Sequence, residues 1–297
     1  MNADLLLDAA AILGEGPVWH HERKTLLWID IEGHQLHETA AHGSSARVIL
    51  IGEQIGCLAP AGGSLVVAGL RSGFSAIDLE TGRRTPIADP ERHLPDNRFN
   101  DGKCDPAGRF WAGTMHTRED PGCGALYCLD ADLRVSCKIP GVSISNGLAW
   151  SADERTMYYV DSPTRRVVAY DYDRSSGAIA HSRVVYEVPT GEGFPDGMTI
   201  DGEGMLWVAL WDGHKVIRVD PSAGRVVGHI DVPASRPTSC AFGGEGYDTL
   251  FITSARIHLT DAQLAKEPHA GGMFVCKPGV SGPPAVVFAG TAALRTR

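Results

Sequence analysis

Four oxygen-bearing side chains, each followed by glycine, recur along the chain: Glu15, Asp101, Asn146 and Asp196. Carboxylate and amide oxygens are the ligands that hard divalent cations such as calcium, magnesium and manganese prefer. Taken singly, an Asp-Gly or Asn-Gly pair is also a common turn for purely conformational reasons. A metal site is therefore indicated only if the fold gathers the four residues in one place.

These positions belong to a sequence repeat that occurs six times: a turn-forming pair, a short apolar strand, a polar turn and a second apolar strand. The pairs are Glu15-Gly16, Ile55-Gly56, Asp101-Gly102, Asn146-Gly147, Asp196-Gly197 and Ser239-Cys240. The second strands begin at residues 27, 65, 110, 157, 206 and 250, so the repeat has a period of 38 to 49 residues. Two further strand segments follow in most copies. Such periods predict an all-β, six-bladed β-propeller of four-stranded antiparallel blades.

Blades pack radially, so equivalent positions of different repeats face one another around a central channel. We expect the four side chains to converge there, each in a turn just before the first strand of its blade. Because a propeller closes as one unit, residues 1–297 are taken as a single domain. Residues 4–13 and the apolar segment 285–288 each read as a strand, and we predict that they share a blade and close the ring. One loop helix is expected at 261–267, after the capping box that Thr260 begins.

The composition is ordinary for a globular protein, with 43% hydrophobic and 21% charged residues. A net charge of −9 without basic runs disfavours nucleic acid as a partner. No apolar stretch approaches a membrane span, and acidic residues interrupt the apolar amino-terminal segment, so no membrane partner and a cytoplasmic location are expected. We expect a monomer or a weak homo-oligomer. The seven cysteines include no Cys-x-x-Cys pair and predict neither a disulfide framework nor a thiolate zinc site.

Five segments, in order, resemble the senescence-marker-protein-30 (regucalcin) and gluconolactonase family. They are LGEGPVW at 13–19, RFNDGK at 98–103, SNGLAW at 145–150, FPDGM at 194–198 and TSCAFGG at 238–244. The resemblance spans nearly the whole chain. It implies a six-bladed propeller that binds one divalent cation and hydrolyses sugar lactones.

The resemblance also implies a role for individual residues. The residues that match the family's metal ligands are Glu15, Asn146 and Asp196. Arg98 and Asn100 match residues that contact the substrate, and Asp101 would lie behind the ligands or face the substrate. The repeat register alone could not separate Asp101 from the ligands.

One loop departs from the animal members of that family. Those members carry a substrate-contacting Glu shortly after Gly-Thr-Met, whereas direct alignment places Arg118 there in this chain. His116 and Glu119 are candidates for the pocket rim, although a loop histidine is more often simply solvated. The substrate preference of the animal members is therefore not carried over.

A lactone is an internal ester, and a bound calcium, magnesium, manganese or zinc ion could polarise its carbonyl and activate water. We assign Asp196 as the general base, with Arg98 and Asn100 orienting the sugar hydroxyls. The alternative for Arg98 is a structural ion pair. Signatures of a serine esterase, a His-Glu-x-x-His zinc enzyme and a phosphate-binding loop are absent from the sequence.

Two other classes of function stay open. One is a calcium-binding or sugar-binding propeller of the regucalcin type without turnover, and the other is a metal-dependent phosphotriesterase on the same architecture. The retained Arg98 and Asn100 favour the lactonase. The sequence does not specify which lactone is preferred, its ring size or which cation is bound.

Overall fold

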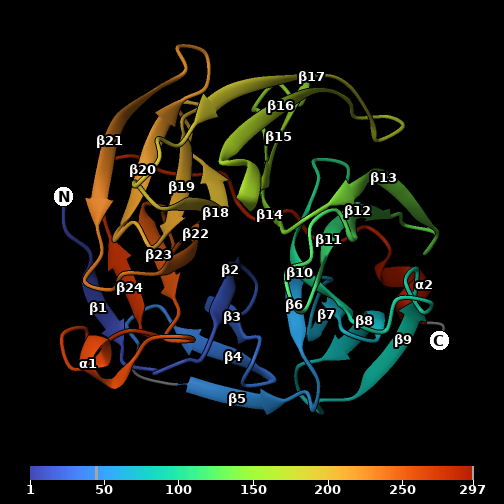
Figure 1. Cartoon of the computed structure of the whole chain (residues 1–297). Helices are drawn as coiled ribbons and strands as arrows, with labels where there is room; N and C mark the ends of the chain where they lie inside the picture. Colours follow the sequence, from blue (N-terminus) through green and yellow to red (C-terminus); the bar gives the residue numbers. More distant parts are fainter. Residues whose placement is uncertain (44–45, 296–297) are drawn as a thin grey trace.

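The computed structural model describes residues 1–43 and 46–295. Six four-stranded antiparallel sheets stand around a central channel as the blades of a propeller (Figure 1). The predicted fold class, number of blades and strands per blade are therefore confirmed. Consecutive strands of each blade lie side by side, and the innermost strands of neighbouring blades contact one another around the axis.

In every blade one strand lines the channel and the other three follow it outward. Blades one to three contain, in this order, β2 (Gly14–His20), β3 (Thr25–Asp30), β4 (Gln35–Ala40), β5 (Ala46–Leu50); β6 (Ile55–Pro60), β7 (Leu65–Leu70), β8 (Gly73–Asp78), β9 (Arg84–Ala88); and β10 (Asn97–Cys104), β11 (Phe110–His116), β12 (Gly124–Leu129), β13 (Val135–Val142). Blades four to six contain β14 (Ser145–Trp150), β15 (Thr156–Asp161), β16 (Arg166–Asp173), β17 (Ala178–Glu187); β18 (Phe194–Ile200), β19 (Leu206–Trp211), β20 (Lys215–Asp220), β21 (Arg225–Asp231); and β22 (Pro237–Gly243), β23 (Thr249–Ser254), β24 (Met273–Cys276), β1 (Asp4–Leu7).

The ring is closed by the amino-terminal strand alone. β1 pairs antiparallel with β24 and completes the sixth blade, as predicted. The prediction that segment 285–288 shares this blade is wrong, because the segment forms no strand. Prolines at 278, 283 and 284 precede it and cannot donate to a ladder. Instead, Phe288 N donates to Pro60 O at 2.8 Å, which anchors the segment against the second blade.

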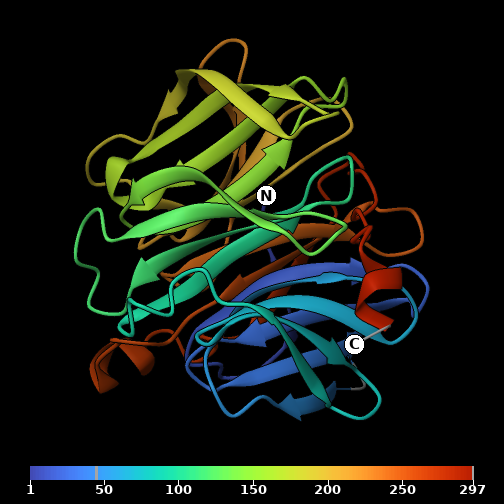
Figure 2. The same ribbon diagram turned by 90° about the vertical axis from the view of Figure 1, so that its right-hand side faces the viewer.

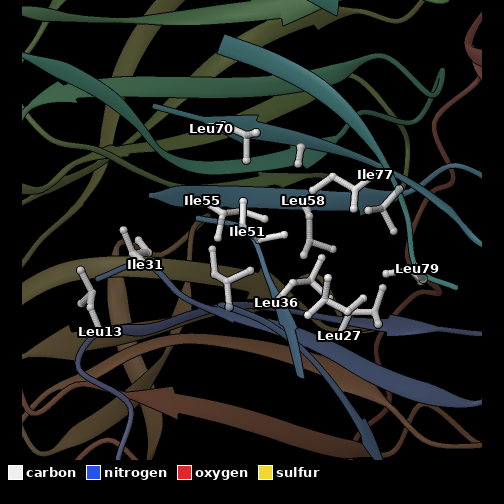
Figure 3. Close-up of a cluster of buried hydrophobic side chains, with 14 of the residues drawn as sticks. Leu13, Leu27, Ile31, Leu36, Ile51, Ile55, Leu58, Leu70, Ile77 and Leu79 are labelled. Carbon is white, nitrogen blue, oxygen red and sulfur yellow. The ribbon is translucent and has the colours of Figure 1, made fainter. Parts of the chain in front are cut away.

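The core fills the spaces between adjacent blades. Between the first two blades, Leu27, Leu58 and Ile77 lie in one buried cluster with residues from both sheets (Figure 3). The tryptophans of the repeated second strands, Trp28, Trp111 and Trp207, are at most 1% exposed. Strands with apolar residues on both faces are expected in a sheet that is covered by neighbouring sheets on both sides.

The helices are short and lie at opposite ends of the molecule in Figure 2. α1 (Asp261–Leu264) begins with the predicted capping box at Thr260 and ends three residues before the predicted boundary. α2 (Thr291–Arg295) buries Leu294 against the second blade, and a 3-10 turn, η1 (Ser162–Thr164), follows β15. No helix in residues 1–43 and 46–295 is long and apolar enough to cross a membrane. All seven cysteines are free, and Cys57, Cys104 and Cys240 are buried in the core.

Acid is expected to weaken the fold through His37 on β4. Its ring stacks on Trp28 with centroids 3.8 Å apart, and Nε2 has no hydrogen-bond partner among the described residues. Burial lowers the pKa of His37 from 6.5 to about 4. His37 therefore takes up a proton near pH 6.5 in the unfolded chain but only near pH 4 in the folded chain. The free energy of unfolding falls as the pH decreases through this window.

We expect His37 to remove about 2 kcal/mol of unfolding free energy between pH 7 and pH 5. Urea denaturation at both pH values measures this loss. In the variant His37→Phe, which keeps an aromatic ring but no titrating group, the loss should be smaller by that amount. Equal pH sensitivity of the two proteins would contradict the prediction.

Candidate metal and substrate site

Each innermost strand is interrupted by a β-bulge at one equivalent place. The register shifts fall between Glu15 and Val18, Ile55 and Cys57, Phe99 and Gly102, Ser145 and Leu148, Pro195 and Met198, and Pro237 and Ser239. All four oxygen-bearing residues of the repeat lie at these bulges. The prediction that they occupy turns before the strand is thus wrong, since they lie inside the strand. A bulge breaks the ladder and turns a side chain out of the alternating pattern.

Three of the four glycines after these residues, Gly102, Gly147 and Gly197, mark close approach of neighbouring blades rather than turns. A Cβ atom on Gly147 would lie 2.7 Å from Asp196 O, and one on Gly197 would lie 2.2 Å from Ser239 Oγ. Of the glycines in the acid-Gly and Asn-Gly pairs, Gly16 alone has a positive φ, at 54°. Small residues therefore let the innermost strands converge, which brings their bulges together at the axis.

Three carboxylates are gathered in this buried ring. Glu15, Asp101 and Asp196 are 5%, 5% and 6% exposed. Burial and then repulsion from Asp196 and Asp101 raise the pKa of Glu15 well above its usual value. Burial and then the charge of Asp101 do the same to the pKa of Asp196. The cluster holds more negative charge than the protein around it compensates, which is the condition that a bound cation relieves.

The amide of Asn146 is held in one orientation by a neighbour. Its Nδ2 donates to Ser162 Oγ at 2.8 Å, and Ser162 Oγ donates to Pro195 O at 2.6 Å. Its Oδ1 accepts from Asn100 Nδ2 at 3.2 Å. The oxygen therefore faces the third blade, where it can also serve as a ligand. Ser162 lies outside the repeat register, so nothing in the sequence indicated this role.

Arg98 and Asn100 form a buried polar pair on β10. Arg98 NH1 donates to Asn100 Oδ1 at 2.7 Å, and Asn100 Nδ2 also donates to Ser145 O at 2.8 Å. Burial lowers the pKa of Arg98, while Glu32, Glu15 and Glu119 act in the opposite direction. Arg98 NH1 also donates to Phe99 O at 3.0 Å. No ion pair of Arg98 is found among the described residues, so the alternative of a structural ion pair has no support there, and the guanidinium keeps donors for another partner.

The loop after β11 has a different arrangement from the one expected. His116 is 8% exposed rather than solvated, and its Nδ1 lies 3.3 Å from Asp120 Oδ2. The side chain of Arg118 is 75% exposed, and its NH2 lies 3.7 Å from Asp120 Oδ2. Glu119 sits at a φ of 59°, and its charge helps to keep Arg98 protonated. Of the three loop residues, Glu119 is the one whose charge acts on the site.

The oxygen donors fit a hard cation better than a thiolate-seeking one. No group of three or more His, Cys, Asp or Glu side chains within the described ranges is arranged to hold a metal ion. The set implied by the resemblance falls outside that pattern, because it combines the carboxylates of Glu15 and Asp196 with the amide oxygen of Asn146. Two buried carboxylates with raised pKa values, beside a fixed amide oxygen, are chemically suited to a divalent cation.

Ser162→Ala is expected to weaken divalent-cation binding by about 10- to 100-fold, since groups that orient a ligand contribute on this scale. Without the hydroxyl, the Asn146 amide loses the acceptor that fixes it. Calorimetric titration with calcium measures the effect. Ser151→Ala, at an exposed turn of the same blade, is the matched control and should bind calcium as the parent does. Unchanged affinity in Ser162→Ala would show that the amide orientation does not matter.

The fold and the donor cluster on its axis define a six-bladed β-propeller with an oxygen-lined site in its channel. Comparison with known proteins then identifies its relatives. The chain belongs to the family described as the SMP-30/Gluconolactonase/LRE-like region, whose model matches residues 13–256. The resemblance inferred from the five sequence segments is confirmed.

Relatives are similar over almost their entire length. The chain is 41% identical to regucalcin of Danio rerio, covering 94% of this chain and 95% of the relative. It is 39% identical to a Bacillus subtilis (strain 168) protein named "Putative sugar lactone lactonase YvrE", covering 98% and 99%. A solved structure of a calcium-binding protein, regucalcin, from Agrobacterium tumefaciens str. C58 superposes with a TM-score of 0.92 at 29% identity, covering 97% of both chains.

Proposed function

We propose that this chain is a metal-dependent hydrolase that opens a sugar lactone, an aldonolactone, to the aldonic acid. The observation that carries the proposal is the hydrogen-bond chain from Arg98 through Asn100 to Asn146. It joins a clamp suited to sugar hydroxyls with a candidate metal ligand. A protein that only stored calcium would have no use for that clamp. Similarity to a relative named as a sugar lactone lactonase supports the same activity.

The residues that would hold the cation are Glu15, Asn146 and Asp196, with water completing the shell. Calcium is the first candidate because a close structural relative is named as a calcium-binding protein, and magnesium, manganese and zinc are the others. When bound, the cation would supply Lewis acidity toward the lactone carbonyl and lower the pKa of water. Burial and repulsion within the carboxylate cluster raise the pKa values of Glu15 and Asp196, and the charge of Arg98 offsets this only in part.

Asp196 would accept the proton from the attacking water. The water oxygen forms a bond to the carbonyl carbon, the bond from that carbon to the ring oxygen breaks, and the ring oxygen takes up a proton. Asp196 is 6% exposed at the bulge of β18, and a carboxylate held next to the attacking water is a suitable general base. Arg98 and Asn100 would hold the sugar hydroxyls so that the carbonyl faces the water.

A pH-stat assay on a panel of aldonolactones, with each cation added in turn, tests the proposal. We expect acid release only when protein and cation are both present. A chelator should abolish it, and added cation should restore it. Failure to hydrolyse any lactone with any of the four cations would overturn the proposal.

The second candidate is a calcium-binding or sugar-binding propeller of the regucalcin type without turnover. It is favoured by the 41% identity to a regucalcin and by the buried carboxylate cluster. Calcium binding by calorimetry without acid release from any lactone would support it. Adding an organophosphate triester to the panel tests the phosphotriesterase alternative, since cleavage of that ester alone would favour it.

A further inference from the structure

A half-buried lysine lies in the channel beside Asp101, one member of the carboxylate cluster. Lys103 lies on β10, two residues after Asp101, and its Nζ donates to Met198 O at 2.6 Å. Met198 lies on β18, and the fourth blade stands between these two blades. The side chain therefore spans the interior of the ring. It lines a cavity of about 460 Å³ that continues the channel away from the bulges.

The ammonium of Lys103 has no carboxylate partner in contact. Among the described residues it forms no ion pair, and its one hydrogen bond goes to a neutral carbonyl. Burial lowers its pKa, and the charge of Asp101 acts in the opposite direction. Burial raises the pKa of Asp101, and the charge of Lys103 acts in the opposite direction. The charge of Asp101 in turn helps to raise the pKa values of Glu15 and Asp196. The ammonium thus acts on the cluster through space rather than by direct pairing.

We propose that Lys103 is a built-in counter-charge that stabilises the carboxylate cluster when no metal is bound and so limits the affinity for the cation. Three carboxylates face two cationic side chains, the buried Arg98 and the half-buried Lys103. The two cationic side chains already offset most of the negative charge of the carboxylates. A bound divalent cation would therefore leave the site with an excess of positive charge. Removing the ammonium leaves a cluster that a divalent cation neutralises in full, because a nearby like charge opposes binding in a poorly hydrated site. The inference rests on the proposed metal site.

Two variants separate the charge from the hydrogen bond. Lys103→Met loses both, whereas Lys103→Gln keeps an N–H donor that can reach toward Met198 O and loses only the charge. Lys138→Met is the matched control, since Lys138 Nζ also donates to a backbone carbonyl, Gly177 O at 2.9 Å, but outside the channel. Calcium affinity is measured by calorimetric titration, and Tm is measured with chelator and with saturating calcium.

We expect both Lys103 variants to bind calcium at least about tenfold more tightly. This corresponds to a change of about 1.4 kcal/mol in the free energy of binding. Their Tm should fall in chelator and recover most of the loss with calcium. Lys138→Met should keep the parental affinity. If Lys103→Gln has the calcium affinity of the parent while Lys103→Met binds calcium more weakly, the hydrogen bond of the lysine matters and its charge does not. That result would overturn the proposal.

Weaker calcium binding by both Lys103 variants would likewise overturn the counter-charge role while leaving the metal site intact. The metal site itself is tested by the parent protein. If the parent shows neither binding heat nor a Tm shift with calcium, magnesium, manganese or zinc, the proposed metal site fails, and the role of Lys103 fails with it.

Discussion

Asp196→Asn is expected to reduce lactone hydrolysis at least about 1,000-fold, because loss of a general base alone costs 10²- to 10⁴-fold. The amide keeps the size of the side chain but cannot accept the proton from water. The same change removes one of the two carboxylates assigned to the cation, so calcium affinity should fall as well. Rates of acid release at saturating lactone and calcium give kcat, and calorimetry gives the calcium affinity.

Asp101→Asn is the matched control for this prediction. It makes the same chemical change to a carboxylate at the equivalent bulge of another blade, with the same 5% to 6% exposure. If Asp101 is not a ligand, this variant loses less calcium affinity and less activity than Asp196→Asn, although loss of its charge from the cluster should weaken calcium binding to some extent. Near-parental turnover by Asp196→Asn at saturating calcium would remove Asp196 from the mechanism.

The repeat allowed the architecture to be predicted because every blade uses the same strand chemistry. Leu27-Trp28-Ile29 and Leu206-Trp207-Val208 are apolar on both faces, and only a sheet packed on both sides accommodates that pattern. The same register predicted equivalent positions for Glu15, Asn146 and Asp196, and in the structure these positions are β-bulges. The turn assignment was wrong because a glycine after a polar residue is equally consistent with a tight turn and with close approach of another strand.

Contacts that cross the ring could not be predicted from local sequence. Ser162 joins Asn146 of its own blade to Pro195 O of the next blade, and Lys103 reaches Met198 O two blades away. Their roles depend on how far apart the innermost strands stand. The apolar segment 285–288 has strand-like composition but lies after prolines, and the sixth blade was already completed by β1. In both cases the deciding quantity is the closed geometry of the propeller, which no single repeat contains.

The frame that carries the site depends on a buried carboxylate at the end of β10. Asp105 is fully buried, and its Oδ1 accepts from the backbone N–H groups of Ala107 and Arg109, each at 2.9 Å. Its Oδ2 accepts from Arg109 Nε at 2.7 Å, Trp111 Nε1 at 2.9 Å and Tyr172 Oη at 2.8 Å. Asp201 repeats this arrangement with the indole of Trp207 in the fifth blade. An Asp six residues before the strand tryptophan therefore locks the turn to the sheet.

Asp105→Ala should lower the free energy of unfolding by about 3–5 kcal/mol, the usual cost of removing one partner of a buried ion pair. The change leaves the buried Trp111 indole N–H and Tyr172 hydroxyl without their acceptor, whereas Arg109 keeps its bonds to two backbone carbonyls. Urea denaturation at pH 7 measures the loss. Asp130→Ala is the control, because Asp130 accepts only backbone N–H groups in a similar turn, and it should cost about 1 kcal/mol. Equal losses in the two variants would mean that the turn, not the buried side-chain network, stabilises the blade.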